Sequence, residues 1–248
     1  MFTVEQRDAL RDEILRLAAE DDRVVAGAAV GSLAVDGGGD RYSDLDLTFG
    51  VVDHVPIAAL LGDWTRTLVE ELDAVHLTDV GQGPTVYRVF LMPDALQFDL
   101  SLTPAAHFRP RGPSFRLLFG ETSAGPMEAA EPPTAEDLFG WGVIYAVHAR
   151  ACIERGRVWQ AEHYVGAVRD RVLSLACLRD GLPAVQGRGY DDLPAETLAR
   201  LDDAHVRSVE PEPLREALAA SVRALVLAGE EADLPDVARV AERLVELR

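Results

Sequence analysis

Two short segments of alternating apolar and acidic residues limit how this chain of 248 residues can fold. The first reads Ser43-Asp44-Leu45-Asp46-Leu47, and the second reads Leu96-Gln97-Phe98-Asp99-Leu100. In a β-strand, side chains two residues apart leave the same face. We therefore predict two strands, each with apolar side chains facing a core and carboxylates facing solvent.

The three carboxylates predict a metal site, because like charges on one face repel one another unless cations neutralise them. Mg²⁺ prefers oxygen ligands and is commonly shared with substrate phosphates. We predict that Asp44, Asp46 and Asp99 bind Mg²⁺ or Mn²⁺; the alternative is a solvated polar face. Gly31-Ser32 ends an apolar run, and its small residues let backbone amides approach a phosphate. The alternative for this pair is an ordinary turn.

The order of these motifs, over residues 24 to 102, resembles that of the polymerase-β-type nucleotidyltransferase superfamily. Length and a helical second half are similar to its antibiotic nucleotidyltransferases, which adenylylate aminoglycosides or lincosamides. The resemblance implies that Asp44 and Asp46 bind both metals, and that Asp99 binds the metal that activates the acceptor hydroxyl. It assigns Gly31 and Ser32 to the β- and γ-phosphates of the nucleotide. Ser43, an oxygen-bearing neighbour of the acidic motif, is a further candidate for nucleotide binding.

One segment departs from the family pattern. A short helix usually follows the serine, but this chain continues as Val35-Asp36-Gly37-Gly38-Gly39-Asp40. Because consecutive glycines disfavour a helix, we predict at most one helical turn here and a loop beside the metal site.

Composition narrows the class of partner. The formal charge is −18, and every basic residue is an arginine. The lack of lysine excludes a P-loop lysine and a Schiff-base lysine. Such a charge argues against nucleic acid and suits a cationic small molecule. The alternative, general solubility, is the simpler explanation of the charge. The six histidines show no ligand spacing, so zinc is not expected.

The same composition bears on location. The sequence contains no run of eighteen apolar residues, so no membrane span is expected. The first residues lack the pattern of a signal peptide. Cys152 and Cys177 lie in apolar helical patterns and are interpreted as buried thiols in a reducing cytoplasm.

Periodicity predicts an α/β fold in which a small mixed-sheet catalytic domain precedes an all-helical bundle. Helices are expected after the capping box Thr3-Val4-Glu5-Gln6 and over 57–72. Strands are expected over 24–30, 44–52, 75–79, 85–92 and 96–103. A Pro- and Gly-rich linker over 121–133 separates residues 1–120 from five helices in 134–248.

The helix expected over 158–179 adds two candidates. Glu162 and Arg169 are seven residues apart and share one helix face. Glu162 is a candidate general base for the acceptor hydroxyl, and Arg169 is a candidate phosphate ligand. The alternative is a charged face with ordinary ion pairs.

Together these patterns predict a metal-dependent nucleotidyltransferase that moves AMP from ATP, or a nucleoside monophosphate from another triphosphate, onto a hydroxyl of a small, cationic acceptor of aminoglycoside type. Two alternatives stay open: a nucleotide-binding regulator or antitoxin-like partner, and an adenylyltransferase that modifies a protein. All three carboxylates are present, which favours an active enzyme.

Overall fold

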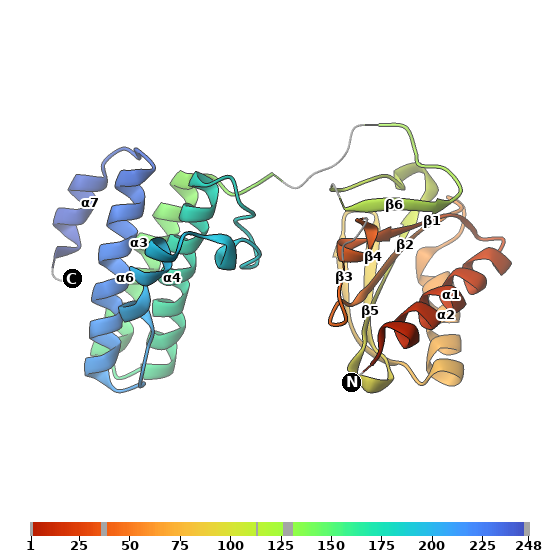
Figure 1. Cartoon of the computed structure of the whole chain (residues 1–248), viewed down its shortest axis with the longest axis horizontal. Coiled ribbons are helices and arrows are strands. Elements are labelled where there is room, and N and C mark those ends of the chain that lie inside the picture. The colour runs from red at the N-terminus through yellow and green to blue at the C-terminus, as the bar shows by residue number, and fades with distance from the viewer. Residues whose placement is uncertain (1, 36–38, 113, 126–130, 246–248) are drawn as a thin grey trace. The chain divides into compact units, whose positions relative to one another are not determined.

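The computed structural model describes residues 2–35, 39–112, 114–125 and 131–245 (Figure 1). The chain divides into two units, Met1–Ala130 and Glu131–Arg248. The first contains a six-stranded mixed sheet and the second is helical, which confirms the predicted fold class. The predicted domain limits, 1–120 and 134–248 with a linker between them, stay a prediction, and 126–130 and 246–248 lie outside the described residues.

The sheet unit has the strand order β3-β4-β5-β2-β1-β6. Its strands are β1 (Val24–Val30), β2 (Leu45–Val51), β3 (Val75–Gln82), β4 (Thr85–Leu91), β5 (Gln97–Pro104) and β6 (Phe115–Phe119). Its helices are α1 (Val4–Glu20) and α2 (Ile57–Leu72), with short 3₁₀ turns η1 (Gly31–Ala34), η2 (Pro93–Ala95) and η3 (Ala105–His107). Neighbouring strands pair antiparallel except β2 and β5, which are parallel.

Helices α1 and α2 cover one face of the sheet (Figure 1). The capping box predicted at Thr3 is present at the start of α1, where Thr3 and Gln6 exchange hydrogen bonds. Trp64 of α2 meets Phe49 of β2 edge to face, with ring centroids 5.3 Å apart. Burying a side chain of this size stabilises the fold by about 1.5–3 kcal/mol. Apolar packing therefore fixes which face of β2 points inward.

Two strand predictions need correction, and a sixth strand was not predicted. Residue 44 precedes β2, which begins at Leu45, because the pairing of β2 with β5 starts there. Strand β3 runs beyond residue 79 because its whole length pairs with β4. Strand β6 was not predicted; it pairs with β1, far away in the sequence. Pro93–Ala95 forms the turn of a hairpin between β4 and β5. The predicted limit of one helical turn after Gly31 is confirmed. Residues 36–38 of the glycine-rich segment lie outside the described residues.

In the described part of the second unit, five α-helices occur, as predicted: α3 (Ala135–Glu154), α4 (Val158–Arg179), α5 (Ala195–Ala199), α6 (Pro211–Glu231) and α7 (Val237–Arg243). Helices α3, α4 and α6 pack against one another around an apolar core. Cys152 and Cys177 are buried and form no disulfide. Across the described residues, no helix combines the length and apolarity needed to cross a membrane.

Candidate metal centre

Asp46 and Asp99 lie directly opposite each other on the parallel strands β2 and β5. Because their neighbours Leu45, Leu47 and Phe98 are buried in the core, both carboxylates lie on the sheet face away from α1 and α2. Asp44 lies two residues before Asp46. One carboxylate oxygen from each of the three residues lies within 4.8 Å of the other two. Among the described residues, no other group of three or more acidic, histidine or cysteine side chains is placed so that it could hold a metal ion.

The donor chemistry of this cluster fits a small divalent cation. All three aspartates are partly buried, so their mutual repulsion is poorly screened. Burial raises the pKa of the Asp99 carboxyl, and the Asp44 carboxylate raises it further, while a hydrogen bond from Gln97 opposes the shift. Mg²⁺ holds oxygens at about 2.1 Å, so oxygens on opposite sides of the ion are about 4.2 Å apart. The three carboxylate oxygens lie within 4.8 Å of one another, close to the widest spacing that ligands of one ion take.

Gly31 forms the wall of the cluster on the β1 side. It begins the turn η1 in the left-handed region, with φ of +66°. A Cβ built at this position would lie 2.4 Å from Oδ2 of Asp46, far closer than any real contact. Only glycine therefore allows this backbone to sit against the Asp46 carboxylate without displacing it. The predicted turn and the predicted metal ligands are in direct contact.

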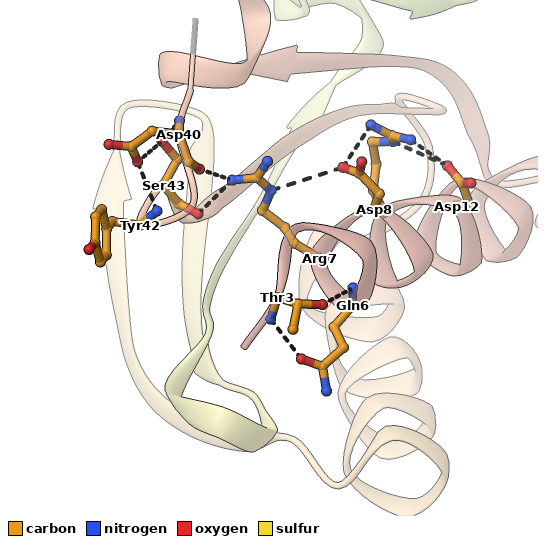
Figure 2. Close-up of polar contacts among 9 residues, drawn as sticks. Thr3, Gln6, Arg7, Asp8, Asp12, Asp40, Tyr42 and Ser43 are labelled. Atoms are coloured by element: carbon orange, nitrogen blue, oxygen red, sulfur yellow. Dashed lines mark hydrogen bonds and ion pairs between the residues drawn. The ribbon is translucent and has the colours of Figure 1, made fainter. Parts of the chain in front are cut away.

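Hydrogen bonds link the residues of the loop 40–43 (Figure 2), and Asp44 is the next residue of the chain. Asp40 accepts hydrogen bonds through Oδ1 from the Tyr42 amide at 2.8 Å and from the Ser43 hydroxyl at 3.2 Å. The Ser43 hydroxyl in turn accepts one from the Asp40 amide at 2.9 Å. Arg7 of α1 reaches the same loop, where it donates to the backbone carbonyls of Asp40 and Ser43.

The predicted site residues fall into two groups. Asp44, Asp46, Asp99 and Gly31 come together in the sheet unit, and Ser32 follows Gly31 in η1 with its side chain exposed. Their catalytic and nucleotide-binding roles stay predictions. The Ser43 hydroxyl is engaged with Asp40, so binding a nucleotide would require it to exchange partners.

Glu162 and Arg169 both lie on α4, in the unit Glu131–Arg248. Glu162 is partly buried, and Nη2 of Arg169 lies 3.5 Å from Asp170. The roles of Glu162 as general base and of Arg169 as phosphate ligand stay predictions.

Two residues beside the carboxylates escaped the sequence analysis. Gln97 donates to Oδ1 of Asp99 at 2.9 Å, and its place two residues before Asp99 on the same strand face was a usable signal. Arg7 gave no signal, because an arginine in a charged amphipathic helix normally faces solvent.

No protein-family model and no curated protein sequence matches this chain. Among the solved structures that are similar to it, two are described by their fold and sequence match. An aminoglycoside 6-adenyltransferase from Bacillus subtilis aligns with 12% identity and a TM-score of 0.40, over 99% of this chain and 98% of its own. A nucleotidyltransferase-like protein from Exiguobacterium sibiricum 255-15 aligns with 15% identity and a TM-score of 0.36, over 91% of this chain and 78% of its own.

Proposed function

We propose that this protein is a metal-dependent nucleotidyltransferase that moves a nucleoside monophosphate, AMP from ATP, onto a hydroxyl group of a small molecule. One observation carries the proposal: three carboxylates converge on the sheet face opposite α1 and α2, in contact with the glycine turn at the end of β1. The motif resemblance described above assigns the same residues to this chemistry.

The chain's own residues supply binding and orientation. Asp44, Asp46 and Asp99 would hold Mg²⁺ or Mn²⁺. When bound, the metal would neutralise the triphosphate and stabilise the negative charge that develops at the α-phosphate during transfer. The acceptor oxygen bonds to the α-phosphorus as the bond from that phosphorus to the pyrophosphate oxygen breaks. The hydroxyl proton passes to solvent water, and pyrophosphate leaves. The backbone amides of the turn after Val30, including Gly31 and Ser32, are the proposed partners of the terminal phosphates.

The strand order supports a proposal for which side of β2 each of the two substrates binds. The phosphate turn ends β1, on one side of β2, whereas Asp99 lies on the other side, next to β4. Val89 of β4 lies opposite Asp99, and Tyr87 lies opposite Ser101 of β5, so both share the sheet face of the carboxylates. Tyr87 and Val89 are both partly exposed. We place the acceptor over Tyr87 and Val89, with its reactive hydroxyl at Asp99.

Two alternatives from different classes stay open: a nucleotide-binding regulator or antitoxin-like partner, and an adenylyltransferase that modifies a protein hydroxyl. Convergence of all three carboxylates favours an active enzyme, since a binding module needs no complete ligand set. The two buried, unpaired cysteines fit a reducing compartment such as the cytoplasm.

Pyrophosphate release tests the proposal. The protein is incubated with ATP, Mg²⁺ and a panel of aminoglycosides and lincosamides, and product masses are recorded with and without EDTA. We expect a gain of one AMP on an acceptor, abolished by EDTA and by Asp46→Asn. Label appearing on a protein from a lysate, with no small molecule modified, would favour the protein-modifying alternative. ATP binding without any transfer would favour the regulator.

A further inference from the structure

Arg7 is a charged residue buried inside the sheet unit. It lies in the second turn of α1 with only 4% of its surface exposed. Its Nη1 donates to the carbonyl oxygen of Asp40 at 2.6 Å and to that of Ser43 at 3.1 Å (Figure 2). Its Nε is buried and makes no hydrogen bond to a described residue, and the carboxylate of Asp8 lies 4.0 Å away.

These contacts are unusual for a buried guanidinium. A buried charge is costly unless it is paired, and arginine normally meets a carboxylate through two parallel hydrogen bonds. Arg7 instead directs one nitrogen at two backbone carbonyls of a surface loop, 33 and 36 residues away in the chain. The buried guanidinium of Arg7 therefore makes its hydrogen bonds to the backbone of that loop, and these bonds fix the path of the loop.

The loop held by Arg7 ends at the one carboxylate that the sheet does not hold. Asp46 and Asp99 lie inside strands and face each other in register. Asp44 precedes β2, so its backbone lies outside the pairing that begins at Leu45 and Phe98. The residue before it, Ser43, is bound through its carbonyl to Arg7 and through its amide to the Asp40 carbonyl at 3.3 Å.

We propose that Arg7 is a positioning residue for the metal centre: by holding the backbone of residues 40–43 against α1, it places the Asp44 carboxylate beside Asp46 and Asp99. Arg7 acts through the loop and contacts no metal or substrate itself. The metal-binding part of this inference rests on the proposed function, whereas the hold on the loop does not.

The test compares Arg7→Met and Arg7→Lys with the matched control Arg23→Met. Arg23 also bridges elements of the sheet unit, through Asp21 and Asp63, but touches nothing in the loop. Two quantities are measured on the full chain: amide hydrogen exchange at Tyr42 and Ser43, and Mn²⁺ affinity by electron paramagnetic resonance, in the absence of nucleotide. Thermal unfolding reports the general loss of stability in each variant.

We expect Arg7→Met to speed exchange at both amides and to weaken Mn²⁺ binding by about 10–100-fold, as loss of a supporting residue does in metal sites. The exchange rates and the Mn²⁺ affinity of Arg7→Lys should lie between those of the parent and Arg7→Met, because an ammonium group can still donate to a carbonyl. Arg23→Met should lose stability but keep the parent's exchange at the loop and its Mn²⁺ affinity.

Equal Mn²⁺ affinity in the parent and Arg7→Met, or equal weakening in Arg7→Met and Arg23→Met, would overturn the inference. If Arg7→Met does not fold, the same comparison is made with Arg7→Lys. A parent protein that binds no Mn²⁺ would contradict the proposed function, and the metal-binding part of the inference with it. The exchange data would then decide whether Arg7 holds the loop.

Discussion

At the scale of single residues, Gly31 is the sharpest constraint on the candidate centre. An alanine at this position would pay the strain of a left-handed backbone, about 1–2 kcal/mol, and would push its Cβ into Asp46. We predict that Gly31→Ala weakens Mn²⁺ binding about tenfold or more, since displacing one ligand disturbs the set.

The control for this change is Gly62→Ala. Gly62 lies within α2, and a Cβ there would meet no atom within 4 Å. This substitution should raise helix stability by about 0.5–1 kcal/mol and leave Mn²⁺ affinity unchanged. Titration of both variants with Mn²⁺ makes the comparison; parent-like affinity in Gly31→Ala would show that the glycine turn does not shape the site.

Asp99 offers a prediction in which binding and stability move in opposite directions. Its pKa is raised in the folded protein, so its ionised form costs stability at pH 7, and that cost disappears below the pKa of the unfolded chain. Asp99→Asn should therefore abolish transfer while raising the unfolding free energy at pH 7 in EDTA.

The matched control for Asp99→Asn is Asp79→Asn on β3. Hydrogen bonds from Arg88 lower the pKa of the Asp79 carboxyl, so its ionised form stabilises the fold. Its loss should reduce stability and spare Mn²⁺ binding. Urea unfolding in EDTA measures both variants, and a destabilised Asp99→Asn would contradict the electrostatic account of the cluster.

At the scale of elements, the sequence predicted those features that depend on residues close together in the chain. The period-two alternation around Asp46 and Asp99 predicted which strand faces carry the carboxylates, and the capping box located α1. Strand β6 escaped because it is short and depends on pairing with β1, where the Phe119 ring lies over Gly27. The path of the loop before Asp44 escaped for the same reason, because Arg7 that fixes it lies on a distant helix.

The junction of α1, β1 and α2 yields a prediction about pH. Asp21 accepts hydrogen bonds from Arg23 and, at 2.9 Å, from Nε1 of Trp64. The Arg23 side chain is the main cause that lowers the pKa of Asp21 to about 2, with further lowering from Trp64. Because the folded pKa lies below the unfolded value, the stabilisation is present above about pH 4 and is lost as pH falls toward 2.

Asp21→Asn should therefore lower the unfolding free energy at pH 7 by about 2 kcal/mol, with the difference from the parent vanishing near pH 2. The neighbouring Asp22→Asn makes the same change in net charge at an exposed residue and serves as control. Denaturant unfolding between pH 2 and 7 gives the curves. A constant difference across this range would show that the carboxylate's charge is not the source of the stabilisation.

At the scale of the whole molecule, the net charge of −18 predicts how the binding of a cationic acceptor depends on ionic strength. An acidic field raises the local concentration of a cation, and salt screens it, since the Debye length falls from about 10 Å at 0.1 M to about 3 Å at 1 M. With Mg²⁺ and ATP saturating, the KM for a polycationic aminoglycoside should rise about tenfold or more across that range. The KM for a neutral hydroxylated acceptor should change little, which makes it the internal control. Initial rates of pyrophosphate release at several salt concentrations give both values. If the two acceptors respond alike, the net charge has no part in acceptor recognition, and the proposed acceptor surface over Tyr87 and Val89 is left to account for acceptor choice.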